Sequence, residues 1–410
     1  MTAAAVTLVS LLALLSCGKE GGENKPPEYG KKPQEQKDTA STPPGTDTTT
    51  VTPVGPASLA DYSDMVLLYG YGHHRSPYSW GREYTDHYVF YTDRTGHTDW
   101  LFDAFLFLEF MDPPVSGGAG KTFITGYVWD DDYIRKSANQ KDWDNLIKYY
   151  FVKDTAIDAI DKSVDEGVRL MGKAPAYKRQ IVIGIPEPIK TEDPFNEYSS
   201  NTYWGSVDGR QLNFSSPEDR ITAVKWYIDR CREEFAKADF KNVELGGFYW
   251  VAEKSTHTAD IIARIGDYLK GMNYSFNWIP YFHAEGYTRW KEFGFTYAFM
   301  QPNYFFNDTI PYERLVEACN DVIKNDMGLE VEFDGKVLVS WGYGYGGRLR
   351  DYMKAFKDYG AWEKSRLVYY QGSWAVKWLH DSTSAEDQEL YYDFCDWVST
   401  RPYRTKLNEQ

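Results

Sequence analysis

Residues 328–334 read Gly-Leu-Glu-Val-Glu-Phe-Asp, and this stretch alternates apolar with acidic side chains. A period of two predicts a β-strand whose side chains point to opposite faces. The apolar residues Leu329, Val331 and Phe333 should then pack against helices, while the acids face the other way. These acids are Glu330, Glu332 and Asp334. If parallel strands close into a barrel, the acidic face points into its interior.

Short apolar runs alternate with helical stretches from about Ser58 onward. This alternation predicts βα units and a parallel sheet. Eight such strands predict an α/β protein with a (β/α)8 TIM-barrel fold, and an open doubly wound sheet is the alternative. The predicted strands are Met65–Gly72, Asp103–Phe110, Gln180–Pro188, Val243–Glu253, Tyr274–Ala284, Phe295–Phe306, Leu329–Asp334 and Arg366–Gly372.

Composition narrows the class of protein. The 410 residues carry a formal net charge of −15, and nucleic-acid binding requires a basic surface, so we expect no nucleic-acid partner. Aromatic residues make up 17% of the chain. Besides building a core, Trp and Tyr in loops can pack against the faces of sugar rings. We expect the protein to be a monomer.

The N-terminal residues have the pattern of an exported lipoprotein. Residues 1–16 form an apolar segment too short to span a bilayer, and they end at Leu14-Leu15-Ser16-Cys17, which resembles a bacterial lipobox. We therefore expect Cys17 to be lipidated, with an ordinary cleaved signal peptide as the alternative. Residues 17–57 have a polar composition typical of a flexible linker, followed by a single domain at 58–410. The expected location is the outer membrane or cell surface.

Polar and aromatic side chains gather where the predicted strands end. The carboxyl ends of all eight strands meet at one mouth of the barrel, so we expect these residues to surround a single site. Salt bridging of the acids to Arg or Lys is the alternative, but the predicted strands contain almost none. The carboxylates are Glu109, Glu187, Glu253, Glu330 and Glu332; the expected substrate-binding residues are Glu109, Glu187, Trp250, Tyr281, His283, Gln301, Asn303, Tyr304, Tyr369, Gln371 and Trp374.

Motifs for metals and nucleotides are weak in this chain. Gly342–Gly347 fits GxGxxG but lacks the acidic residue that a dinucleotide site needs, so we expect no cofactor and interpret it as an aromatic loop at the rim. Asp130–Asp132 lacks the alternation of a calcium loop. His73 and His74 have no partner at a metal-ligand spacing. We therefore expect no metal for catalysis.

Four segments resemble a known family. They are Met65–Tyr69, Trp100–Phe107, Gly247–Trp250 and Gly328–Asp334. Together they are similar to a family of secreted bacterial proteins known as domain of unknown function 4855 (DUF4855), and the similarity extends over nearly all of the chain after the linker. The resemblance implies a glycosidase-like barrel in a glycan-degrading bacterium.

Two functions fit these observations. The first is a glycoside hydrolase acting on an oligo- or polysaccharide, which needs two carboxyl groups beside the scissile bond. Many retaining (β/α)8 glycosidases place the acid after strand four and the nucleophile on strand seven. Glu253 and Glu332 occupy similar positions, with Glu330 the rival of Glu332, although Ala252 stands where those enzymes commonly have Asn. The second is a non-catalytic surface lipoprotein that binds glycan at the same mouth.

Overall fold

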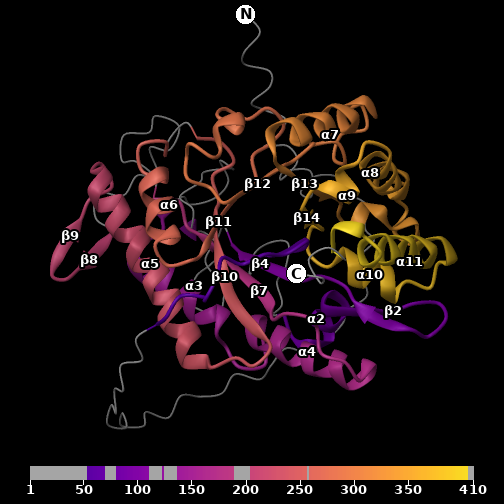
Figure 1. The fold of residues 1–410 in the computed structure, drawn as a ribbon, viewed down its shortest axis with the longest axis horizontal. Coiled ribbons are helices and arrows are strands. Elements are labelled where there is room, and N and C mark those ends of the chain that lie inside the picture. Colours follow the sequence, from indigo (N-terminus) through magenta and orange to yellow (C-terminus); the bar gives the residue numbers. More distant parts are fainter. Residues whose placement is uncertain are drawn as a thin grey trace, which may run out of the picture. The chain divides into compact units, whose positions relative to one another are not determined.

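The computed structural model describes residues 53–69, 80–109, 122–123, 136–188, 204–255 and 258–404. In this part of the chain, eight parallel strands close into a barrel (Figure 1). β1 pairs with both β4 and β14, so the first and last strands seal the barrel. The strands are β1 (Asp64–Tyr69), β4 (Ala104–Leu108), β7 (Arg179–Ile185), β10 (Val243–Trp250), β11 (Ser275–Trp278), β12 (Tyr297–Met300), β13 (Gly328–Glu332) and β14 (Leu367–Tyr370). Each overlaps one of the eight predicted strands, which confirms the (β/α)8 fold.

Helices surround the strands (Figure 1). Local sequence explains where several begin: Ser216 caps the longest one through the N–H of Asp219, and Pro217 occupies its first turn. The helices are α2 (Arg82–Val89), α3 (Gln140–Tyr150), α4 (Ala156–Met171), α5 (Pro217–Ala238), α6 (Ile262–Lys270), α7 (Glu313–Asn325), α8 (Gly346–Asp358), α9 (Ala361–Lys364), α10 (Ala375–Asp381) and α11 (Ala385–Ser399). Short pairs β2–β3 (Phe90–Thr92, Thr98–Trp100), β5–β6 (Thr122–Phe123, Lys136–Ser137) and β8–β9 (Gly205–Val207, Arg210–Leu212) lie outside the barrel sheet.

Side-chain alternation along the strands separates two apolar layers. The larger layer packs between strands and helices and contains Leu329, Val331 and Phe333, as predicted. The smaller layer fills the barrel interior with residues of the opposite parity, such as Val368 and Tyr370 of β14. Because successive side chains on a strand point to opposite faces, Glu330 and Glu332 face the interior.

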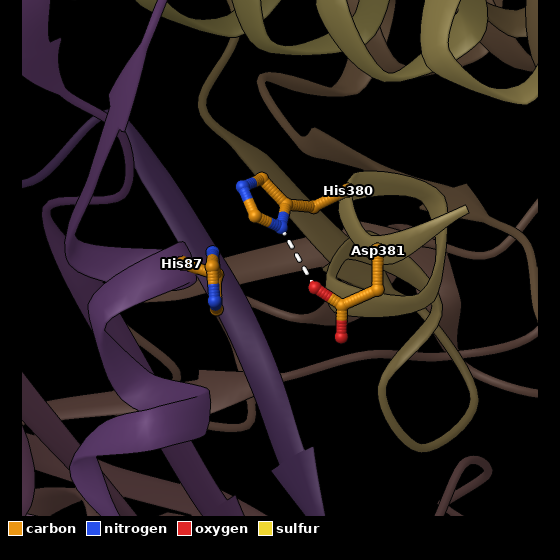
Figure 2. Close-up of side chains that lie close together, drawn as sticks. All are labelled: His87, His380 and Asp381. Carbon is orange, nitrogen blue, oxygen red and sulfur yellow. Dashed lines mark hydrogen bonds and ion pairs between the residues drawn. The ribbon is translucent and has the colours of Figure 1, made fainter. Parts of the chain in front are cut away.

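The barrel closes along a seam between α2 and α10, which follow its first and last strands. Tyr84 of α2 stacks on Trp374 with ring centroids 4.2 Å apart. The Tyr88 hydroxyl donates a hydrogen bond of 2.9 Å to Gln371 Oε1. Figure 2 shows His87 of α2 facing His380 at the end of α10. Aromatic packing and one buried hydrogen bond thus hold the two ends of the barrel together.

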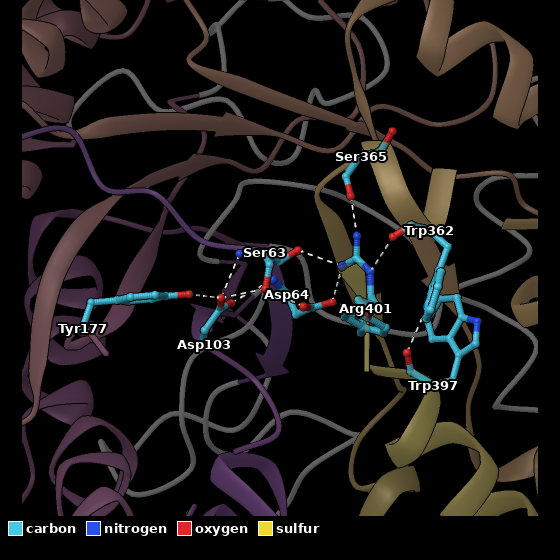
Figure 3. A network of polar contacts seen from close by, with 9 residues as sticks. Ser63, Asp64, Asp103, Tyr177, Trp362, Ser365, Trp397 and Arg401 are labelled. Atoms are coloured by element: carbon cyan, nitrogen blue, oxygen red, sulfur yellow. Dashed lines mark hydrogen bonds and ion pairs between the residues drawn. The ribbon is translucent and has the colours of Figure 1, made fainter. Parts of the chain in front are cut away.

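A buried polar network supports the N-terminal ends of β1 and β4 (Figure 3). The Arg401 guanidinium pairs with the Asp64 carboxylate, and neither side chain is exposed to solvent. It also donates to the carbonyl of Ser63 at 3.0 Å. Asp103 accepts hydrogen bonds from the backbone N–H of Asp64 at 2.8 Å and from the hydroxyl of Tyr177 at 2.5 Å. These charges are compensated locally, so the network stabilises the closed barrel.

The last residues of the expected linker pack against the barrel. Arg232 donates to the carbonyl of Pro53 at 3.0 Å, and Asn273 donates to that of Pro56 at 3.1 Å. Residues 1–52, including Cys17, lie outside the described residues. Among the helices that are described, none has the length and apolar character needed to cross a membrane.

Candidate active site

Three glutamates come together in the barrel interior. Glu330 and Glu332 lie on β13, and Glu253 follows the end of β10. Glu330 and Glu332 are only 3% and 2% exposed. Glu253 and Glu332 both repel the charged form of Glu330, so the three carboxyl groups are electrostatic neighbours. The structure thus brings together the three residues expected to carry the chemistry.

Glu332 is held by hydrogen-bond donors on one side. Its Oε2 atom accepts hydrogen bonds of 2.6 Å from the Tyr352 hydroxyl and of 2.6 Å from the backbone N–H of Asn303. Asn303 has a φ of 53°, a left-handed conformation that Asn tolerates better than most residues. Such donors favour the ionised form of a carboxyl group and fix its orientation.

Burial works against these donors. It raises the pKa of Glu332 to about 7, against the lowering effect of the hydrogen bonds from Tyr352 and the backbone of Asn303. For Glu330, burial and repulsion from Glu332 and Glu253 raise the pKa well above its usual range. The two acids therefore differ: Glu330 has a pKa well above its usual range, and the pKa of Glu332 lies near neutral pH.

Amide side chains connect Glu253, which follows β10, with Glu332 on β13. Gln301 Nε2 donates 3.1 Å hydrogen bonds to Glu253 Oε1 and to the carbonyl of Ile279. Asn303 Nδ2 lies 3.2 Å from Gln301 Oε1, so the chain of contacts runs from Glu253 to Glu332. Tyr281 also lies near Glu253. Burial and the charge of Glu253 raise the pKa of the Tyr281 hydroxyl. Gln301, Asn303 and Tyr281 therefore lie in the site, where the sequence predicted them.

Tyr304 contacts the Tyr352 hydroxyl through its backbone. Its backbone N–H donates to the Tyr352 hydroxyl at 3.3 Å. Its ring lies 3.6 Å under the guanidinium of Arg348, and its own hydroxyl donates to Asp351 at 2.6 Å. Tyr304 is therefore a positioning residue whose side chain binds the first turns of α8 instead of facing the carboxylates.

Trp250 and Tyr369 lie on the other side of the sheet. Trp250 is fully buried, donates to Thr258 Oγ1 at 3.3 Å, and packs against the ring of Phe276. Tyr369 is also fully buried, and its hydroxyl donates to Asp64 at the opposite end of the barrel. Both have the strand parity that faces the helices. The structure therefore assigns them to core packing and not to the mouth.

The other predicted residues have different surroundings. Trp374 is 7% exposed and stacks in the seam, and Gln371 is fully buried there. His283 Nε2 lies 2.7 Å from Asp321 of α7. Burial and the charge of Glu109 raise the pKa of Tyr150, which lies in the helical layer. Glu187 is buried beyond the end of β7.

One residue of the site was not among the predicted residues. Tyr352 lies on α8, and no strand-end rule points to a helix residue. Trp341 and Tyr343 are 44% and 50% exposed in the connection after β13. Tyr343 belongs to the Gly342–Gly347 loop that was predicted as an aromatic rim, and Trp341 precedes that loop directly. Asp130–Asp132 and the pair His73 and His74 lie outside the described residues.

Several solved structures resemble the chain at low sequence identity. GH26C from a Muricauda species is 12% identical, with a TM-score of 0.39, over 83% of this chain and 86% of that one. ICChI chitinase from Ipomoea carnea is 11% identical, with a TM-score of 0.38, over 81% and 99%. A mutant tryptophan synthase α-subunit from Pyrococcus furiosus is 9% identical, with a TM-score of 0.32, over 83% and 98%.

No curated protein matches the chain. The similarity that does extend along the sequence is to a family, and it covers residues 64–396, from the first residue of β1 into α11. The four segments quoted above all lie in that range, as do Glu253, Glu330 and Glu332. The chain therefore belongs to the family described as domain of unknown function DUF4855.

Proposed function

We propose that the protein is a glycoside hydrolase acting on an oligo- or polysaccharide at the mouth of its barrel. The observation that carries the proposal is the environment of Glu332, whose Oε2 atom accepts two short hydrogen bonds beside two further carboxyl groups. Hydrolysis of a glycoside needs one carboxyl group that gives a proton and another that is ionised. Amide groups of Gln301 and Asn303 beside them suit the hydroxyl groups of a sugar.

Each carboxyl group has a distinct role in this proposal. Glu253 gives a proton to the glycosidic oxygen as the bond to the anomeric carbon breaks. Glu332 either attacks that carbon or removes a proton from the water that attacks it. The donors on Oε2 keep Glu332 oriented and favour its ionised form. The raised pKa of Glu330 disfavours its charged form, so a second negative charge beside Glu332 is disfavoured.

The aromatic rim, formed by Trp341 and Tyr343, would bind sugar units away from the scissile bond. Trp341 lies against Trp378 with ring centroids 4.8 Å apart, yet its side chain stays 44% exposed. An exposed indole held in place from behind presents a flat apolar face, and sugar C–H groups pack on such faces. The rim lies in the connection between β13 and α8, so it is on the loop side of the strand that carries Glu332.

Hydrolysis of a panel of glycans by purified protein is the direct test. Wild type should release reducing ends from at least one glycan, and Glu253→Gln and Glu332→Gln should lower that rate by about 10²–10⁴ while still binding it. Glu389→Gln is the matched control, because Glu389 is exposed on α11.

The pH profile separates the two possible role orders. If Glu332 acts as nucleophile or base, activity should fall as pH drops below about 7; if it gives the proton, activity should fall above about 7. Full turnover in both Gln variants would refute the assignment. Binding of glycans without hydrolysis of any would instead favour the non-catalytic surface protein.

We further propose that Cys17 is lipidated and that residues 17–57 tether the barrel to the outer membrane or cell surface. The Leu14–Cys17 motif and the polar composition after it support this arrangement. Cys17→Ala should move the protein from the membrane fraction to the soluble fraction. A variant that stays with the membrane would contradict the anchor.

A further inference from the structure

Two histidines and an aspartate meet at the seam of the barrel, on different elements from the three glutamates. His87 lies in the last turn of α2, and His380 and Asp381 end α10. The two imidazole rings have centroids 4.1 Å apart, and His380 Nδ1 lies 2.8 Å from Asp381 Oδ1 (Figure 2). One ligand atom from each residue lies within 4.8 Å of the other two.

We propose that His87, His380 and Asp381 bind a divalent transition-metal ion, with Zn²⁺ the best match. Two imidazole nitrogens and one carboxylate oxygen are ligands that zinc prefers, at about 2.0–2.2 Å. Side-chain adjustment would be needed to bring all three atoms to that distance. The side chains of His380 and Asp381 are 42% and 48% exposed, which leaves room for a water molecule as fourth ligand. This would be a site with three protein ligands and one solvent ligand.

Metal binding would replace the direct contact between His380 and Asp381. His380 and Asp381 share a hydrogen bond between Nδ1 and Oδ1. If the metal binds Nδ1, that nitrogen carries no proton, so the imidazole proton lies on Nε2 and the ring stays neutral. Neutral imidazole is the form that binds metal.

Neighbouring side chains hold two of the ligands in place. Tyr391 packs edge-on against His380 at 5.3 Å between centroids. His87 precedes Tyr88, whose hydroxyl is anchored on Gln371. Preorganised ligands lose less conformational freedom when they bind a metal.

Lys377 is the competing cation at this site. Its ammonium group pairs with Asp381, so it neutralises the carboxylate that a metal would use. Metal binding must therefore displace Lys377, which costs affinity. This competition gives a prediction that a merely structural cluster does not make: removal of Lys377 should strengthen metal binding.

The bound ion would link the two ends of the barrel. α2 belongs to the first βα unit and α10 to the last, and β1 pairs with β14 beside them. A ligand that binds only the folded state shifts the folding equilibrium toward that state. Zinc should therefore raise the thermal stability of the closed barrel without contacting the three glutamates.

The test is a zinc titration of tag-free protein against a fluorescent zinc chelator, combined with thermal unfolding. Wild type should bind Zn²⁺ and gain thermal stability. His87→Gln should weaken binding by at least about tenfold, because loss of a ligand costs no less than loss of a supporting partner. Lys377→Met should bind more tightly than wild type, and a misfolded variant cannot give that result.

His283→Gln is the matched control. His283 lies with Glu317 and Asp321 in a second cluster of similar composition, which is the alternative zinc site. Its zinc affinity should equal that of wild type. The proposal is overturned if wild type takes up no zinc at micromolar free concentration, if His87→Gln binds like wild type, if Lys377→Met binds no more tightly, or if His283→Gln abolishes binding.

Discussion

We predict how the free energy of unfolding of Glu332→Gln compares with that of wild type at two pH values. The difference should shift in favour of the variant when the pH rises from 5 to 8. Burial raises the pKa of Glu332 from its ordinary 4.5 to about 7. The folded wild type therefore binds this proton more tightly than the unfolded chain. With respect to this group, its stability is greatest below pH 4.5 and falls as pH rises through about 7.

The size of the effect follows from that difference. Each pH unit between the two pKa values corresponds to about 1.4 kcal/mol, so keeping Glu332 ionised inside the barrel costs about 3 kcal/mol at high pH. Between pH 5 and pH 8, about 2 to 3 kcal/mol of this cost should appear in wild type and be absent from the variant. Glutamine can still accept the hydrogen bonds from Tyr352 and Asn303, so the variant can keep both contacts.

Urea unfolding followed by circular dichroism measures the free energy of unfolding of both proteins at both pH values. Glu389→Gln provides the comparison, and the gap between it and wild type should stay constant. The refuting result concerns the free energy of unfolding of Glu332→Gln minus that of wild type. If this difference were the same at both pH values, or lower at pH 8, then Glu332 would not be the desolvated carboxyl group described here.

Three further perturbations probe other parts of the molecule. Arg401→Met leaves Asp64 buried without its cation, which should lower the free energy of unfolding by about 3–5 kcal/mol in urea. Tyr352→Phe removes a donor from Glu332, so the pH at which activity changes should rise by about one unit. Trp341→Ala should weaken glycan binding by about tenfold and leave the melting temperature unchanged, because this indole is half exposed; equal binding would return Trp341 to a structural role.

Periodicity in the sequence predicted the fold because the strands of a buried parallel sheet are short apolar runs. The alternation in residues 328–334 also predicted which side of β13 faces inward, and the position of Leu329 in the helix-facing layer agrees. The same rule, applied to β10 and β14, would have excluded Trp250 and Tyr369. Both lie one residue out of phase with interior residues of their strands, such as Tyr249 and Tyr370.

Position at a strand end predicted Gln301 and Asn303 correctly as neighbours of the glutamates, because the βα loops begin where the strands meet. It could not predict Tyr352, since the angle at which α8 packs on β13 decides whether a helix side chain reaches the barrel interior. The pKa of Glu332 likewise depends on burial that arises only when the sheet closes. Sequence pattern thus fixes which residues can face the mouth, and tertiary packing decides which of them meet.

The barrel contains two buried clusters of acidic residues, and they differ in how their negative charge is compensated. At the N-terminal end, Asp64 is matched by Arg401, and Asp103 by hydrogen-bond donors, as in a network that serves stability. Within the described residues, neither Glu330 nor Glu332 forms an ion pair, and burial raises the pKa of both. Salt bridging was the structural alternative to a functional site, and these two residues do not follow it. Carboxyl groups kept at a cost to stability, beside amide and hydroxyl groups, are the arrangement expected where protons are moved.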